Sequence, residues 1–138
     1  MKELFPFLFV VVESDIMSVT SFRDLIVWQK ADELFFMVVD DASRFPKITV
    51  AIVIKTQLIR AVGSISSNIA EGWSARHGKE FLQGLMVARK EAGETLNWLL
   101  KTYQLGYISE ERLAVYETNL DEIRKMINSL AAKIRRNG

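Results

Sequence analysis

Apolar positions recur every three or four residues along four successive stretches of the chain, which is the pattern of amphipathic helices. The stretches run from about residue 23 to 43, 49 to 73, 79 to 105 and 109 to 136. Because short links join these long helices, the sequence predicts an all-α fold, an antiparallel up-down-up-down four-helix bundle. The predicted core faces, in chain order, are Trp28, Ala31, Phe35, Val38, Val39 and Ala42; Ile54, Leu58, Ala61, Val62, Ile65 and Ile69; Phe81, Leu85, Ala88, Ala92, Leu96, Leu99 and Tyr103; and Leu113, Tyr116, Leu120, Ile123, Ile127, Leu130 and Ile134.

Residues that start and stop helices agree with these boundaries. Ser21 or Thr20 can cap the first helix, and Pro46 stops it because the residue before a proline avoids the helical conformation. Gly106 suits the left-handed residue that follows the third helix, and Ser109 suits the N-cap of the fourth.

Residues 1–20 are expected to form an N-terminal extension outside the domain, and residues 21–138 the bundle. The apolar run Leu4–Val12 resembles a signal-peptide core, but no small-residue cleavage site follows it. It is too short to span a bilayer. The alternatives are an upstream extension with the native start at Met17, or an apolar arm that packs on a neighbouring subunit.

The amino-acid composition limits the classes of protein to which this chain can belong. Cysteine is absent, which excludes disulfides and thiolate metal sites and fits a cytoplasmic location. The formal net charge of +1 gives no overall attraction to nucleic acid or to an anionic membrane. The apolar fraction of 49% is high for a small chain and suggests burial between subunits.

The second helix carries a polar stripe beside its apolar face: Gln57, Arg60, Ser64, Asn68 and Glu71. One interpretation is a solvated face. However, a solvated face usually carries lysine and glutamate, whereas amides, a hydroxyl and a single Arg–Glu pair suit a partly buried network or a contact surface.

The third helix has a second apolar feature in Val87, Trp98 and Leu105, with Glu91 and Glu94 beside them. These three residues are either half-covered by their neighbours or candidates for an oligomer interface.

Basic residues without any acid close the chain from Ile123 onward. These cations complement the dipole at the C-terminus of the helix, or they bind a polyanion such as RNA. The candidate nucleic-acid-binding residues are Arg124, Lys125, Lys133, Arg135 and Arg136.

The sequence contains none of the residue patterns that are typical of catalytic or metal sites. His77 is the only histidine and has no partner at ligand spacing, and no glycine-rich phosphate loop or nucleophile motif occurs. Glu71 and Glu94 could approach each other across the second and third helices, where Arg60 favours a salt-bridge network over acid–base catalysis. We therefore expect no catalytic residue, no metal and no cofactor, and a protein that is not an enzyme.

Several motifs stand at fixed distances along the chain. Phe22–Ala31 reads FRDLIVWQKA, Phe45-Pro46 follows, Gln57–Ala61 reads QLIRA, Ser64-Ile65 precedes NIAEG at Asn68–Gly72, Lys79–Phe81 reads KEF, and Leu105–Ile108 reads LGYI. Together these motifs resemble the four-helix-bundle proteins of the 23S rRNA intervening-sequence family over about residues 22–130.

The resemblance implies a bacterial, cytoplasmic four-helix bundle that assembles as a ring-like homopentamer. Related bundles are accessory proteins of diversity-generating retroelements, where they bind a reverse transcriptase and its template RNA. The signature residues carried over are Gln57, Arg60, Ser64, Asn68, Glu71 and Gly72, with Glu94 retained on the third helix.

Three departures from the family pattern concern the second and third helices. Ser67 replaces the usual proline, and Trp73–Arg76 replaces the usual Gly-Arg. Lys90-Glu91 replaces a Gly-Ser pair. These changes leave the fold expectation intact and weaken any contact expected of the loop between these helices.

Two functions from different classes follow. The first is an oligomeric, non-enzymatic protein that binds RNA or DNA through a basic surface of the assembled oligomer. The alternative is a protein-binding scaffold, such as an accessory subunit of a reverse transcriptase. Neither involves a membrane.

Overall fold

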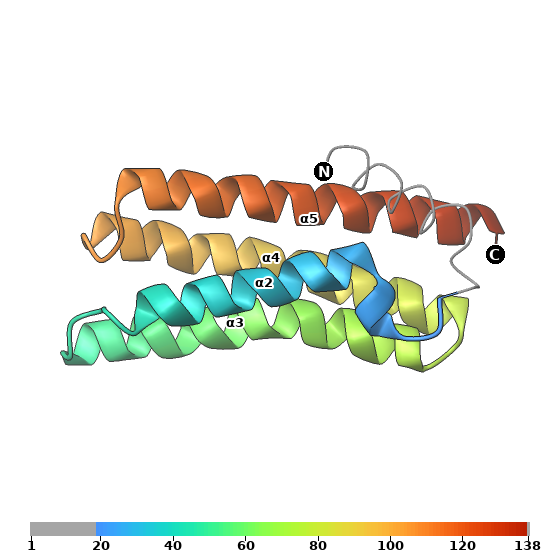
Figure 1. The fold of residues 1–138 in the computed structure, drawn as a ribbon, viewed down its shortest axis with the longest axis horizontal. Coiled ribbons are helices and arrows are strands. Elements are labelled where there is room, and N and C mark those ends of the chain that lie inside the picture. Colours follow the sequence, from blue (N-terminus) through green and yellow to red (C-terminus); the bar gives the residue numbers. More distant parts are fainter. Residues whose placement is uncertain (1–18, 138) are drawn as a thin grey trace.

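The computed structural model describes residues 19–137. The interpretations of residues 1–18 lie outside the described residues. A 3₁₀ turn, η2 (Phe22–Asp24), leads into four helices: α2 (Ile26–Ala42), α3 (Thr49–Ser74), α4 (Gly78–Gln104) and α5 (Glu110–Asn137). The helices run alternately up and down (Figure 1), so the predicted all-α bundle is confirmed.

The first helix begins later than the sequence suggested, at Ile26. Ser21 caps the 3₁₀ turn instead of the α-helix: its hydroxyl accepts the Arg23 N–H at 3.2 Å, while Asp24 accepts the Ser21 N–H at 3.3 Å. The extended conformation of Leu25 separates this turn from α2 and buries the Leu25 side chain completely.

The predicted core face of α2 was partly wrong. Leu34 is buried, at 1% exposure, whereas Val39 is 36% exposed and Phe35 is half-buried. Apolar residues occupy more than half of the circumference of this helix, so periodicity alone could not choose between neighbouring faces.

The other predicted faces agree more closely with the structure. All six residues on α3 are buried, as are Leu113 to Leu130 of the α5 stripe. On α4, Leu96 and Tyr103 are half-buried, and Thr95 and Thr102 enter the core instead. Their hydroxyls donate to backbone carbonyls one turn earlier, at 2.8 and 2.7 Å, which satisfies them in an apolar setting.

Two glycines allow α3 and α4 to approach closely. A Cβ on Gly84 would lie 2.5 Å from the Asn68 carbonyl oxygen, and one on Gly72 would lie 3.0 Å from the Glu80 carbonyl oxygen. Gly106 has φ +81°, as its position after the third helix predicted.

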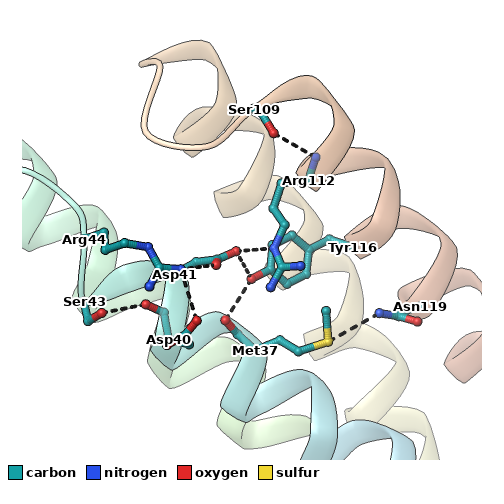
Figure 2. A network of polar contacts seen from close by, with 9 residues as sticks. All are labelled: Met37, Asp40, Asp41, Ser43, Arg44, Ser109, Arg112, Tyr116 and Asn119. Atoms are coloured by element: carbon teal, nitrogen blue, oxygen red, sulfur yellow. Dashed lines mark hydrogen bonds and ion pairs between the residues drawn. The ribbon is translucent and has the colours of Figure 1, made fainter.

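A polar cluster fastens α2 to α5, and Figure 2 shows it between the end of one helix and the start of the other. We call it the Asp41 anchor: Asp41, Arg44, Arg112 and Tyr116. Asp41 Oδ2 lies 2.5 Å from the Tyr116 hydroxyl and 2.6 Å from Arg112 Nε, and Asp41 Oδ1 lies 2.9 Å from Arg44 Nη2. The Tyr116 side chain is fully buried, and its hydroxyl is satisfied because it can donate to Asp41 or to the Met37 carbonyl oxygen.

Candidate nucleic-acid interface

The five candidate cations lie along the C-terminal half of α5. Arg124 and Arg135 are eleven residues apart, close to three turns, and so share one side of the helix. Lys125 and Arg136 share the next side in the same way. All but the half-buried Lys133 are exposed, so their charges are available to a ligand.

Asp121 divides these cations into two groups. It lies one turn before Arg124 and Lys125, and its carboxylate oxygens are 2.9 and 3.2 Å from their nitrogens. Hydrogen bonds from Arg124 and Lys125 lower the pKa of Asp121. Because that acid stands just before the segment considered in the sequence, its effect on these two cations was missed.

The loop between α3 and α4 brings further basic residues to the same end of the bundle. Gly78 lies against α5, where a Cβ on it would be 3.6 Å from the Ile134 side chain. Arg76, His77 and Lys79 flank this contact and are exposed. Figure 1 shows this loop and the C-terminal end of α5 at one end of the molecule.

Arg76 has an unusual conformation within that loop. Its φ of 63° is in the left-handed region, uncommon for a residue with a side chain. Its guanidinium lies 5.4 Å from the centre of the Trp73 ring, a cation–π distance. The sequence signal that could have located this group was the antiparallel order, which returns the loop to the end of α5.

The polar stripe of α3 forms a half-buried network, with exposed ends. Arg60 is ion-paired with Glu94, lies 3.7 Å from Glu91 Oε1, and donates to Gln57 at 3.3 Å. Asn68 donates to the Ser64 carbonyl and hydroxyl oxygens at 2.8 and 2.9 Å. The stripe therefore has features of both interpretations. Its side chains form a partly buried hydrogen-bonded network, while Arg60 and Glu71 are exposed to solvent.

The expected approach of Glu71 to Glu94 is wrong. Glu94 pairs with Arg60, which stands eleven residues before Glu71 on the same helix. That separation corresponds to roughly 16 Å along α3 at 1.5 Å per residue. The two carboxylates cannot act as an acid–base pair, while Gly72 of the signature serves the close contact with Gly84.

The oligomer-interface candidates on α4 differ in exposure. Trp98 packs partly against the core and donates its indole N–H to Glu94 Oε2 at 3.1 Å. That bond is the main cause that lowers the pKa of Glu94, and Arg60 adds to it. Val87 is half-buried, and Leu105 is 47% exposed. Only Leu105 offers a largely free apolar surface.

Within residues 19–137, no group of three histidine, aspartate or glutamate side chains is placed to hold a metal ion. One oxygen of Glu91 is buried without a hydrogen-bond partner, and the Arg60 guanidinium is the charge that faces it. Within residues 19–137, the exposed Arg76, Lys79, Arg135 and Arg136 are in no ion pair with a carboxylate.

Comparison with known proteins agrees with this architecture. A crystal structure of a protein with unknown function from the S23 ribosomal protein family of Bacteroides thetaiotaomicron superposes with a TM-score of 0.71 at 28% identity, covering 77% of this chain and 98% of that one. No curated protein matches. The model of the family described as 23S rRNA-intervening sequence protein matches residues 23–129. The chain therefore belongs to the 23S rRNA-intervening sequence protein family.

Proposed function

We propose that this protein is a non-enzymatic, oligomeric binding protein that holds RNA at the basic end of its bundle. The observation that carries the proposal is the contact of Gly78 with Ile134, which sets Arg76 and Lys79 beside the last turns of α5. We call the basic end Arg76, Lys79, Lys133, Arg135 and Arg136.

The charges of the basic end suit a polyanion. Within residues 19–137, none of these five side chains is in an ion pair with a carboxylate, although Glu80 stands next to Lys79 in the sequence. Phosphate groups bound there would displace counterions, and in an oligomer the field of several copies would add.

Arg124 and Lys125 are expected to matter less. Their charges are offset by Asp121, and exposed ion pairs of this kind must be broken or shared before a phosphate binds. The effects of Arg124 and Lys125 on binding can therefore be compared with those of the unpaired cations farther along the same helix.

The test compares two variants of the full chain in binding to a structured RNA. Changing Arg135 and Arg136 to glutamine should weaken binding and reduce the salt slope of log K by about 0.7–0.9 for each phosphate that the variant no longer neutralises. The matched control, R124Q with K125Q, should change the slope by less. If the control lowers affinity and slope as much as the first variant, the site is misplaced; if neither changes them, the proposal fails.

A protein-binding scaffold is the second candidate, favoured by the opposite end of the bundle. Ile48, Val50 and Val53 at the start of α3 are 52–54% exposed, and Leu105 at the end of α4 is 47% exposed. Such an apolar end suits a protein partner such as a reverse transcriptase. A reverse transcriptase encoded beside this gene, co-purifying with the wild type and lost with V53D, would favour this function.

A further inference from the structure

The loop between α3 and α4 holds an arginine in a backbone conformation that favours glycine. Arg76 has φ 63°, and a residue with a side chain pays a free-energy cost in this left-handed region that glycine would avoid. The turn that ends α3 imposes the conformation, and in it the Arg76 N–H donates to the Trp73 carbonyl oxygen at 3.1 Å. Residues held in this way are concentrated at ligand sites, so the contacts of the Arg76 side chain decide its role.

The Arg76 side chain lies over an aromatic ring. Its guanidinium carbon is 5.4 Å from the centre of the Trp73 ring, and Trp73 is half-buried and packs against the core. The indole is therefore a fixed support for the planar cation. Arg76 itself is exposed, and within residues 19–137 its side chain makes no hydrogen bond or ion pair. Its N–H groups and the side that faces away from Trp73 are available to a ligand.

Two other cation–π contacts in the described part of the chain lack these features. Arg112 lies 5.2 Å from the centre of the Tyr116 ring, but it is ion-paired within the Asp41 anchor. Lys101 lies 5.7 Å from the centre of the Trp98 ring, but its ammonium group has no planar face. Arg76 differs from both because it combines a planar cation, an aromatic support and no bonded acid.

The position of Arg76 places this stacked pair among the cations of the basic end. Arg76 stands two residues before Gly78, so their Cα atoms are at most about 7 Å apart. A Cβ on Gly78 would in turn lie 3.6 Å from the Ile134 side chain, next to Arg135 in the last turns of α5. A phosphate chain bound at the basic end therefore passes close to the Arg76 guanidinium.

An unpaired nucleotide has the features that this arrangement can bind. A base inside a duplex has both faces covered by its neighbours, whereas a base in a loop, in a bulge or at a strand end can offer a face to a side chain. Guanidinium planes and aromatic rings are the groups on which such bases stack. The edge of the guanidinium can at the same time donate hydrogen bonds to a phosphate.

We propose that Arg76, supported by Trp73, stacks on an unpaired base of the RNA bound at the basic end, so that the protein selects RNA with single-stranded nucleotides over fully paired duplex. This inference rests on the proposed function, in which the other cations of the basic end bind the phosphates. The stack adds selection for an unpaired base of any sequence, because every base has a π-face.

The first experiment compares the affinity of the full chain for two RNA hairpins with the same stem and the same number of phosphates. One has a loop of adenosines, and the other has a loop of abasic nucleotides. The wild type should bind the adenosine loop roughly 5- to 150-fold more tightly, the factor that corresponds to one stacked base. R76K keeps the charge but loses the planar group, so it should reduce the ratio of the two affinities toward 1. The matched control R23K makes the same exchange at an exposed arginine of η2 and should keep the wild-type ratio.

The second experiment separates stacking from stability and from charge. R76G should remain folded, because glycine adopts φ 63° without strain, and should lose the preference for the adenosine loop. W73L should reduce the preference, because the guanidinium loses its aromatic support. Since both hairpins carry the same phosphates, the loss of a charge alone does not change the ratio. Circular dichroism checks that each variant keeps its helices.

Each other outcome has one meaning. A wild type that binds neither hairpin overturns the proposed function and this inference together. A wild type that binds both hairpins equally overturns the stacking alone and leaves RNA binding standing. The stacking is also wrong if R76K or folded W73L keeps the wild-type ratio, or if R23K loses it as fully as R76K does.

Discussion

Replacing Tyr116 with phenylalanine should destabilise the bundle while keeping its shape. Tyr116 is fully buried, and its hydroxyl lies 2.5 Å from Asp41 Oδ2 and 3.1 Å from the Met37 carbonyl oxygen (Figure 2). A hydrogen bond to a charged group contributes about 1.5–3 kcal/mol. Because Arg112 and Arg44 still neutralise Asp41 in the variant, we expect a loss of about 1–2 kcal/mol.

The assay is urea unfolding followed by helical circular dichroism, at one protein concentration for every variant. For a domain of this size each kcal/mol should lower Tm by roughly 3–5 °C. The control is Y103F, since Tyr103 is a half-buried tyrosine on α4 and should stay within about 0.5 kcal/mol of the wild type.

The pH dependence gives a sharper test of the same contact. Burial, together with the Asp41 carboxylate, raises the pKa of Tyr116. A group whose pKa is raised by folding contributes its full stability below the unfolded value, near pH 10, and loses it as the pH rises above that value. The advantage of wild type over Y116F should therefore shrink above pH 10 by about 1.4 kcal/mol per pH unit. Parallel stability curves for the two proteins between pH 9 and 11 would refute the reasoning.

Three further predictions concern other parts of the bundle. G84A should destabilise strongly, by about 2 kcal/mol or more, because its Cβ would lie 2.5 Å from the Asn68 carbonyl oxygen; denaturant unfolding measures this, and a neutral result would show that the helices can separate at little cost. W98F should raise the pKa of Glu94 toward its ordinary value, since the indole N–H is the main group that lowers it; carboxyl NMR titration follows the shift, and an unchanged midpoint would contradict the bond. S109A should cost about 1 kcal/mol in unfolding free energy, because the Ser109 hydroxyl accepts a first-turn N–H of α5 at 3.1 Å; a cost below about 0.3 kcal/mol would show that water replaces the cap.

Sequence by itself determined the four helices and most of their ends. Gly106 and Ser109 act through their own backbone and neighbours in the chain, so their roles can be read locally. The core of α3 also followed from the sequence, because all six residues predicted for it are buried, although Val50, Ile52 and Val53 lie exposed on its other sides.

Tertiary structure decided which of two apolar sides of α2 faces inward. Leu34 and Phe35 are adjacent and similarly apolar, and only the positions of the neighbouring helices bury Leu34 in the core and leave Phe35 half-buried. The pairing of side chains across helices also could not be predicted from the sequence. Glu94 lies beside Arg60 and not beside Glu71, because the Gly72–Gly84 contact sets the register between α3 and α4.

The candidate site shows the same division. The cations of α5 were visible in the sequence, since they are close together along one helix. Asp121 neutralises Arg124 and Lys125 through spacing within one helix, whereas the joining of Arg76 and Lys79 to the remaining cations depended on the return of the α3–α4 loop to Ile134. Local spacing fixes charges and caps within one helix, whereas a surface made by several helices exists only once packing has brought distant segments together.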